Sequence, residues 1–303
     1  MYKNFIAFIR HIKDINKWFL AKSLTVQNKN SGNIFLHNFK KTKKLAFVCI
    51  VRNEDQYLLE WLNFHYLQGV DCVVLYDNAI DDQKAAITKK LLQQYISKKI
   101  LIYIRWPDIP SLRVGTEKNS SRKKFNIQEL AYFHFHRYYS KYFDYYAKVD
   151  IDEFIYNKDG SLISNDLIFN GVCTIWGYNF GSSGAITNEL KPVSERFKYR
   201  SSTLSHAKTI NKSSDVYEWF NAHTAFLYPW KLVFNRSFDE RPLHNGKLRL
   251  NHYRIKSKEE FMQRKVLNIS GFTAGDYSEK EFYELDEAMN IVYDDAICSV
   301  RHL

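Results

Sequence analysis

Apolar runs alternate with stretches of helical spacing through the first half of the chain. Residues 45–51 form an unbroken apolar run, which is typical of a strand buried on both faces of a sheet. A helical pattern follows this run and ends near Gly69. The later elements expected here are strands over 71–75, 100–104 and 145–149, and helices over 85–95 and 126–139. Strands and helices that alternate at this spacing predict a parallel, right-handed α/β sheet.

The second half has a less regular pattern. It predicts a strand over 172–175, a glycine- and serine-rich loop over 181–184 and a last helix over about 285–300. Ser257 and Glu260 have the spacing of a capping box, which predicts that a helix over 258–266 begins there. The chain therefore divides into an N-terminal helix with its linker over 1–43, one large α/β domain over 44–270 and a C-terminal helical tail over 271–303.

The spacing of apolar residues at the N-terminus predicts a basic amphipathic helix. Apolar side chains recur at helical intervals between Phe5 and Phe19, with lysines and an arginine interleaved. Such a helix either packs on its own domain or lies on an anionic lipid surface, and the pattern leaves both interpretations open. The sequence contains no run of about 18 apolar residues, so we expect no transmembrane span.

The charge and the cysteines narrow the choice of partners and compartments. A formal net charge of +11 predicts a negatively charged partner, which can be nucleic acid, anionic lipid or a diphosphate. Aromatic residues make up 16% of the chain, an amount that suits stacking on bases or sugar rings. Cys49, Cys72 and Cys173 fall within apolar, strand-like runs, so we interpret them as buried free thiols rather than disulfide or zinc residues.

Polar segments follow three of the predicted strands, at residues 52–54, 76–78 and 150–153. Ligands of open α/β sheets bind beyond the carboxyl ends of the strands. In the third segment, Asp150 and Asp152 can both turn toward one divalent cation while Ile151 points into the core. Hard oxygen ligands with open positions suit Mg²⁺ or Mn²⁺ that carries a substrate diphosphate. A solvated turn after a strand is the alternative interpretation.

An ordered set of motifs across residues 45–266 resembles glycosyltransferase family 92 and its family-2-like relatives. These motifs are residues 48–54 (VCIVRNE), 60–65 (EWLNFH), 69–70, 76–78 (YDN), 148–154 (KVDIDEF), 180–184 (FGSSG), 195–197, 208–210 and 251–261 (NHYRIKSKEEF). The resemblance implies a GT-A type fold, in which a mixed, mostly parallel sheet is flanked by helices and residues 44–270 form a single catalytic domain. It also implies transfer of a hexose, galactose above all, from a UDP-sugar with inversion at the anomeric carbon.

The same resemblance assigns roles around the donor. Asp150 and Asp152 would hold Mn²⁺ or Mg²⁺ on the donor diphosphate, and His252 would be the third metal ligand. The donor-binding residues would be Arg52, Asn53, Glu54, Tyr76, Asp77, Asn78, Lys208 and Lys256. Lys256 would face the same phosphates if the stretch from His252 onward is helical. Relatives carry serines after the Asp-Asn pair, where this chain has Ala79 and Ile80, so its donor contacts differ in detail.

The acceptor side is less constrained by the sequence. We expect acceptors to dock on the glycine- and serine-rich loop, through Trp176, Phe180, Gly181, Ser182, Ser183 and His223. Core packing is the competing interpretation for His223 and for part of the aromatic series. Transfer needs a base for the acceptor hydroxyl, and we assign Glu195, with Asp239 and Glu240 as alternatives. An ion pair between Glu195 and a neighbouring arginine explains that glutamate equally well.

Two other function classes fit the sequence less well. A basic nucleic-acid-binding protein would match the charge, but lysine and arginine are dispersed and no nucleic-acid-binding motif occurs. A sugar nucleotidyltransferase of related fold would need a glycine-rich turn after the first strand, which residues 52–54 do not provide. We therefore predict a glycosyltransferase with a glycan or lipid-linked glycan acceptor, in surface polysaccharide or lipopolysaccharide synthesis, without a nucleic-acid partner. We expect it in the cytoplasm, peripheral at the inner face of the cell membrane, on anionic lipid through residues 1–22.

Overall fold

The computed structural model describes residues 45–108, 127–167, 171–204, 206–219, 225–227, 247–266 and 277–300. The expected N-terminal helix and its linker, His223, Asp239 and Glu240 lie outside these residues. Within the described part of the chain, no helix is long and apolar enough to cross a membrane.

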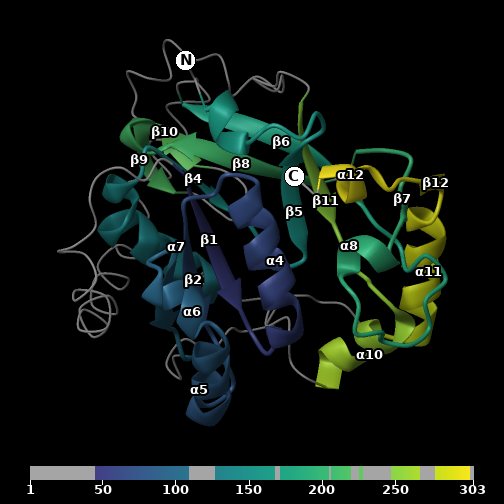
Figure 1. Ribbon diagram of the computed structural model, residues 1–303. Helices are drawn as coiled ribbons and strands as arrows, with labels where there is room; N and C mark the ends of the chain where they lie inside the picture. Colours follow the sequence, from purple (N-terminus) through teal and green to yellow (C-terminus); the bar gives the residue numbers. More distant parts are fainter. Residues whose placement is uncertain are drawn as a thin grey trace, which may run out of the picture.

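Strands and helices alternate through the first half of the chain, as the sequence pattern predicts (Figure 1). The elements are β1 (Leu45–Val51), α4 (Asp55–Leu67), β2 (Cys72–Asp77), α5 (Asp82–Leu91), α6 (Gln93–Ser97), β3 (Leu101–Arg105), α7 (Ile127–Tyr138), the 3-10 turn η1 (Ser140–Tyr142) and β4 (Tyr145–Lys148). The single helix expected over 85–95 is in fact two, because the chain turns at Leu92.

The second half contains shorter elements. They are β5 (Glu153–Asn157), η2 (Ile163–Asp166), β6 (Val172–Asn179), α8 (Val193–Arg196), β7 (Tyr199–Arg200), β8 (His206–Lys212), η3 (Ser213–Asp215), β9 (Val216–Trp219), β10 (Ala225–Leu227), β11 (Leu248–His252), α10 (Lys258–Val266), α11 (Glu279–Met289), β12 (Val292–Tyr293) and α12 (Ala296–Val300). The strand expected over 172–175 is therefore twice as long as its apolar run.

Eight strands form one mixed sheet in the order β3-β2-β1-β4-β8-β6-β11-β5. The first four run parallel, and β11 is parallel to β6. The β8 and β5 strands are antiparallel to their neighbours. The predicted α/β class, a mixed, mostly parallel sheet with flanking helices, is confirmed.

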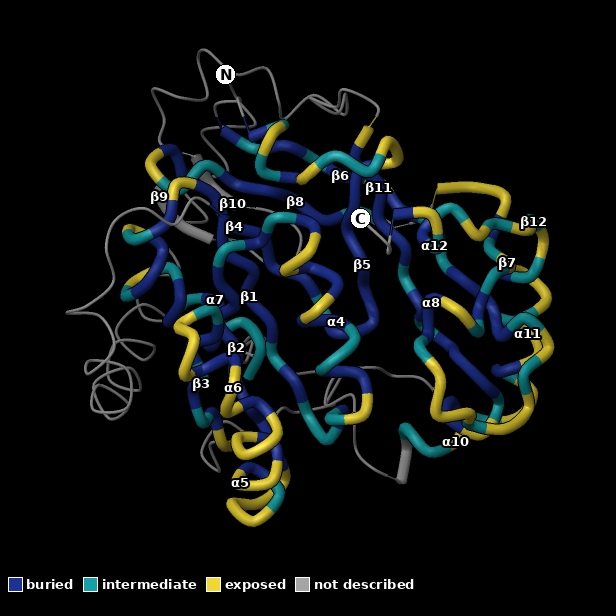
Figure 2. The backbone as a smooth tube through the Cα atoms, in the orientation of Figure 1, coloured by how far each residue is buried: buried dark blue, intermediate teal, exposed yellow. Residues whose placement is uncertain are grey.

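Both faces of the sheet are covered, which explains the unbroken apolar run of β1. Phe47 and Cys49 pack in a core with α4, whereas Ala46 and Val48 pack in a second core with α7. The strands at the centre are buried along their length, and exposed residues gather on α5 and on the outer side of α11 (Figure 2). The cysteine prediction is confirmed, since Cys49, Cys72 and Cys173 are buried and form no disulfide within the described part of the chain.

The C-terminal part corrects one expectation. The helix expected over 285–300 is wrong, because α11 ends at Met289 and β12 pairs antiparallel with β7 before α12 begins. Asn290 ends the helix, and the N–H of Ile291 donates to the carbonyl of Arg200 at 3.1 Å instead of continuing the helical ladder. The helix at 258–266 and its capping box are confirmed, since Ser257 N–H reaches Glu260 Oε2 at 3.1 Å and Glu260 N–H reaches Ser257 Oγ at 3.2 Å.

Candidate active site

The carboxyl ends of β1, β2 and β4 meet at one edge of the sheet (Figure 1). The register places Val51 beside Asp77, and the N–H of Asn78 donates to the carbonyl of Val51 at 2.9 Å. The N–H of Val149 donates to the carbonyl of Val48 at 3.0 Å. The three polar segments singled out in the sequence therefore lie along the same edge.

Asp150 sits over a buried lysine. Its Oδ2 lies 2.6 Å from Lys208 Nζ, and its Oδ1 accepts from Gln128 Nε2 at 3.0 Å. The same ammonium lies 3.0 Å from Glu153 Oε2, which also accepts the N–H of Asp150 at 2.8 Å. Burial lowers the pKa of Lys208, but Asp150 and Glu153 outweigh it and raise that pKa above its ordinary value. Lys208, predicted to bind the donor, is thus the fixed counter-charge beneath Asp150.

Asp152 is buried and faces Arg264, His252 and Lys256. Its Oδ2 lies 3.2 Å from the Arg264 guanidinium, and its Oδ1 lies 3.5 Å from His252 Nε2. Burial raises the pKa of this carboxyl, but His252, Lys256 and Arg264 together hold the pKa well below its ordinary range. Ile151 points into the core, as expected for the residue between the two aspartates.

The last residue of β11 brings His252 to this edge. β11 lies between β5 and β6, and His252 is in register with Glu153 on one side and Asn179 on the other. His252 Nδ1 lies 2.9 Å from Asn179 Oδ1. An amide oxygen accepts and does not donate, so Nδ1 carries a proton, and Nε2 faces Asp152. His252 therefore lies at the Asp152 carboxylate, where the sequence resemblance places it.

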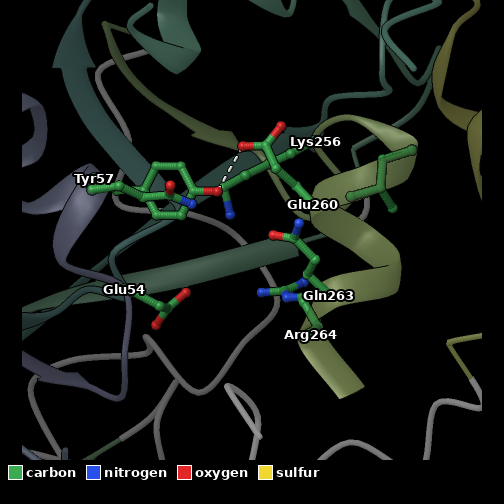
Figure 3. A pocket seen from close by; sticks show the side chains of 8 residues that line it. Glu54, Tyr57, Lys256, Glu260, Gln263 and Arg264 are labelled. Atoms are coloured by element: carbon green, nitrogen blue, oxygen red, sulfur yellow. Dashed lines mark hydrogen bonds between the residues drawn. The ribbon is translucent and has the colours of Figure 1, made fainter. Parts of the chain in front are cut away.

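A pocket opens beside Asp152, between the start of α4 and the segment that leads into α10 (Figure 3). It has about 290 Å³ of empty space, part of it open to solvent. The side chains that line it are Glu54, Gln56, Tyr57, Ile255, Lys256, Glu260, Gln263 and Arg264. In Figure 3 the groups of Glu54, Lys256 and Arg264 point toward one another from three different segments.

The two glutamates of the pocket are engaged very differently. Glu260 accepts from both terminal nitrogens of Arg196 at 2.8 Å, and from Tyr57 OH at 2.6 Å. Burial raises the Glu260 pKa, but the hydrogen bonds from Arg196, Ser257 and Tyr57 lower it to about 2. Burial raises the pKa of Glu54 to about 7, although Lys256 and Arg264 lower it. Glu260 is therefore held as a carboxylate, and Glu54 titrates near neutrality.

Lys256 reaches the pocket from a strained backbone. Its φ is +58°, a left-handed conformation that is rare outside glycine. Residues 253–256 are not helical, so the condition under which Lys256 was expected to follow His252 is not met. The side chain is buried, and its ammonium lies 4.4 Å from the centre of the Tyr57 ring. Burial and the nearby Arg264 lower the Lys256 pKa. Among the described residues no hydrogen bond to this ammonium is found.

Three of the expected donor-binding residues are held by contacts at the ends of β1, β2 and β3. Arg52 donates to Asn78 Oδ1 at 2.8 Å and to Asp108, and Asn78 Nδ2 donates to the carbonyl of Trp106 at 2.8 Å. Asp77 accepts from the hydroxyl of Tyr103. These contacts hold the polar ends of the strands in place.

Two further donor candidates differ from this group in their surroundings. Tyr76 is fully buried and its hydroxyl lies 2.9 Å from His134 Nδ1, on the α7 side of the sheet. Asn53 has a φ of +57°, so it makes the left-handed step that turns the chain from β1 into α4.

The expected acceptor residues are mostly enclosed. Trp176 is exposed, but Phe180 is fully buried against Tyr253. The loop after it is held by α11 and the residue that ends it: the Ser182 N–H donates to Asp286 Oδ1 at 2.7 Å and the Ser183 N–H to Asn290 Oδ1 at 3.0 Å.

Gly181 lies so close to α11 that any side chain there would collide with it. A Cβ at Gly181 would lie 2.2 Å from Asn290 Oδ1. The backbone of the glycine- and serine-rich loop is thus packed against α11.

Glu195, the expected base, is exposed on α8. The neighbouring Arg196 pairs with Glu260 across the pocket wall.

Several residues of the site were not found in the sequence. Arg264 contacts Asp152 from 112 residues away, and Asn179 contacts His252 from 73 residues away. Arg264 does carry a signal, because it lies four residues after Glu260 and so shares its face of α10. Gln128 lies in the first turn of α7, and no local pattern relates it to Asp150.

No group of three His, Cys, Asp or Glu side chains within the described ranges is arranged to hold a metal ion by itself. Asp152 and His252 fit two of the positions around such an ion, because Nε2 of the ring and a carboxylate oxygen face each other across 3.5 Å. Mg²⁺ sites commonly use one or two protein ligands and complete the shell with substrate phosphates and water. The donor set therefore fits a cation that arrives with its substrate.

A family model described as glycosyltransferase family 92 matches residues 46–254. A search of curated proteins found no match. A crystal structure of the active-site mutant Q189E of LgtC is 10% identical, and the match covers 82% of this chain and 97% of that chain with a TM-score of 0.30. A TM-score of that size carries no argument about the site. The family match reaches every strand of the central sheet and includes the candidate metal ligands Asp150, Asp152 and His252.

Proposed function

Because the chain belongs to glycosyltransferase family 92 and is a glycosyltransferase, we propose that it transfers a hexose, galactose first, from a UDP-sugar to a glycan acceptor with inversion. Family membership favours this reaction over the sugar nucleotidyltransferase and nucleic-acid-binding alternatives. The observation that carries the finer proposal is the facing pair of Asp152 Oδ1 and His252 Nε2 at the carboxyl edge of the sheet, 3.5 Å apart.

The facing pair supports a divalent cation, Mn²⁺ or Mg²⁺, bound with the donor. An imidazole that donates through Nδ1 can offer the electron pair of Nε2 to a cation beside the Asp152 carboxylate. Asp152 and His252 would hold the cation, and Asp150 would take part from the other side of Ile151. Such a cation supplies Lewis-acid neutralisation of the diphosphate that leaves. Asn179 keeps the imidazole in the required orientation.

Two positively charged side chains would neutralise the leaving diphosphate together with the metal ion. Lys256 and Arg264 both point into the pocket beside Asp152. The leaving diphosphate gains charge as the bond to the sugar breaks, so fixed positive groups at this place stabilise the transition state more than the bound donor. The buried Lys256 ammonium, with its cation–π contact to Tyr57 and no hydrogen bond in the described residues, is available for a phosphate oxygen.

A further part of the proposal names the acceptor and the place in the cell where transfer occurs. We assign a glycan or lipid-linked glycan acceptor in surface polysaccharide or lipopolysaccharide synthesis, at the cytoplasmic face of the cell membrane. The basic amphipathic pattern of residues 1–22 supports a site on anionic lipid. These residues lie outside the described part of the chain.

A donor screen tests the proposal. The full-length protein is incubated with UDP- and GDP-hexoses, with and without Mn²⁺, and release of the nucleoside diphosphate is measured. We expect turnover of one UDP-hexose, UDP-galactose first, and a loss of at least about 100-fold when EDTA removes the cation. Equal turnover with and without the cation would contradict the metal role, and preference for GDP-sugars would contradict the donor assignment.

A further inference from the structure

Lys208 is a charged side chain enclosed inside the molecule. It lies on β8, and none of its side chain is exposed. The pairing of β8 with β4 ends at Ala147 and Ile210. Lys208 lies two residues further along β8, beside the turn that carries Asp150. An ammonium with no exposed surface has no open path to a substrate phosphate in this structure, so its contacts are with the protein itself.

The ammonium of Lys208 joins two carboxylates. Its Nζ lies 2.6 Å from Asp150 Oδ2 and 3.0 Å from Glu153 Oε2. The side chain of Glu153 is as fully buried as that of Lys208, whereas 31% of the Asp150 side chain is exposed. Glu153 Oε2 also accepts the N–H of Asp150 at 2.8 Å. Of these three charged groups only Asp150 can meet a ligand, and the other two fix both its backbone and its carboxylate.

Gln128 fixes the other oxygen of the same carboxylate. Its Nε2 donates to Asp150 Oδ1 at 3.0 Å and to the hydroxyl of Tyr132 at 3.1 Å. Gln128 belongs to the first turn of α7 and Lys208 to β8, so two elements far apart in the sequence hold Asp150 from two sides. A carboxylate with a partner on each oxygen cannot rotate freely, so its exposed part keeps one direction.

Stability alone does not account for this arrangement. Taking an ammonium and a carboxylate out of water costs free energy, and apolar side chains of similar volume often stabilise a protein as well or better. A fixed carboxylate is useful where it must meet a ligand at a set place. The residues behind a metal-binding group typically contribute about 10- to 100-fold to metal affinity or activity. At this edge of the sheet the ligand would be the metal–diphosphate complex.

We propose that Lys208 and Gln128 are positioning residues of the glycosyl transfer, which hold the Asp150 carboxylate in the direction in which it meets the metal ion and the diphosphate. Lys208 does so without touching either of them. The inference rests on the proposed function, because it requires a metal-bound diphosphate at this edge of the sheet. The effect of Lys208 must then pass through Asp150, and it must disappear when that carboxylate is absent.

The test compares UDP binding with and without the metal ion. Lys208→Met alone would leave Glu153 buried without its cation and destabilise the fold. It is therefore combined with Glu153→Gln, which keeps an acceptor for the N–H of Asp150 and preserves the net charge of the cluster. UDP is titrated into the full-length protein by calorimetry, in Mn²⁺ and in EDTA. In the double variant we expect the affinity in Mn²⁺ to fall by about 10-fold or more, and the affinity in EDTA to change less than about twofold.

A second comparison shows whether the effect passes through Asp150. The same two changes, Lys208→Met and Glu153→Gln, are added to an Asp150→Asn variant. UDP binding in Mn²⁺ should then weaken by less than about twofold further, because the changes act on one unit and their effects do not add. An equal loss in both backgrounds would mean that Lys208 acts on the donor directly, and it would overturn the inference.

Two further variants make the result specific. Lys280→Met with Glu284→Gln removes the same two charges from the surface of α11 and should leave UDP binding unchanged. If the Lys208 variant does not fold, Gln128→Leu decides, because it frees Asp150 Oδ1 and leaves the buried charges in place. It should show a metal-dependent loss of about 10-fold. A wild-type affinity in Mn²⁺, in whichever of these two variants folds, would overturn the positioning role.

This inference and the proposed function fail in different ways. If wild type binds UDP equally well in Mn²⁺ and in EDTA, the metal ion of the proposed function is wrong and the positioning role fails with it. If wild type binds UDP more tightly in Mn²⁺ and the Lys208 variant gains as much from the metal, the proposed function stands and only the positioning role is lost.

Discussion

Asp152 is the residue on which most of the charge in the site converges. Arg264, His252 and Lys256 all face it. Together they lower the pKa of its carboxyl by more than burial raises it. Asp150 has a different neighbourhood, since Lys208 and Gln128 hold it on the other side of Ile151. The two aspartates of one motif are thus supported by separate sets of residues.

The first prediction at this scale concerns His252 and the residue that orients it. His252→Ala removes a ligand and should raise the Mn²⁺ concentration for half-maximal rate by more than about 100-fold. Asn179→Ala leaves the imidazole in place but frees its orientation, so we expect a smaller rise, of about 10-fold. Both values come from Mn²⁺ titrations of the steady-state rate, with the melting temperature followed in parallel.

The decisive result is that His252→Ala raises the Mn²⁺ requirement more than Asn179→Ala does, without a loss of stability. His252 is only partly exposed, at 13% of its side chain, but removing it opens space at the edge of the site rather than in the core. Both variants should therefore melt within a few degrees of wild type. An unchanged Mn²⁺ requirement in His252→Ala would exclude the ligand role, and Asn179 would then be a structural residue only.

At the scale of elements, α10 shows how a local signal and a distant contact combine. Ser257 and Glu260 form the capping box that their spacing predicts. Glu260 also binds Arg196 of α8 and Tyr57 of α4, so the first turn of α10 joins three elements. The capping box could be predicted because its residues are three apart. The contacts to Arg196 and Tyr57 could not, because they depend on how the chain returns over 64 and 203 residues.

Glu260→Gln tests this junction. The change leaves the Arg196 guanidinium buried without a charged partner, and breaking a buried pair costs roughly 3–5 kcal/mol of unfolding free energy. The pKa of Glu260, lowered from 4.5 to about 2, corresponds to about 3 kcal/mol, which agrees with that range. Urea unfolding at pH 7 measures the difference from wild type.

The pH dependence of the same measurement has a defined sign. The pKa of Glu260 is lower in the folded chain, so its stabilisation is complete above about pH 4.5 and is lost as the pH falls toward 2. The difference in unfolding free energy between wild type and Glu260→Gln should therefore become smaller from pH 7 to pH 3. Glu284→Gln, on the exposed face of α11, should show no such gap at either pH. A gap that stays constant with pH would mean that lost packing, not lost charge, destabilises the variant.

At the scale of the whole molecule, the first half of the sheet was predictable and the second was not. Strands β1 to β4 are parallel and follow their helices in sequence, so periodicity fixed their existence and their common edge. Strands β8, β6, β11 and β5 interleave in an order that no local pattern encodes. The antiparallel and parallel pairings on either side of β11 bring His252 to Asp152. Here the family resemblance located a residue that periodicity could not.

The last prediction concerns residues 1–22 and how the molecule meets its acceptor. If the amphipathic helix lies on lipid, each of its lysines and arginines near an anionic surface contributes about 1 kcal/mol of attraction, which salt screens. Deleting residues 1–22 should then abolish cosedimentation with vesicles that contain phosphatidylglycerol, while hydrolysis of the soluble donor remains within about twofold of wild type. The full-length protein should bind neutral phosphatidylcholine vesicles only weakly. It should dissociate from the anionic vesicles in about 1 M salt, which screens the attraction.

A helix packed on its own domain predicts the opposite pair of results. Its removal would expose the apolar surface that Phe5 to Phe19 had covered, so the truncated chain would melt at a lower temperature and still bind vesicles as wild type does. A matched variant distinguishes charge from burial: replacing Lys3, Arg10, Lys13 and Lys17 with glutamine keeps the apolar face and removes the attraction. Loss of vesicle binding in that variant, with an unchanged melting temperature, places the helix on the membrane and the active site beside a lipid-linked acceptor.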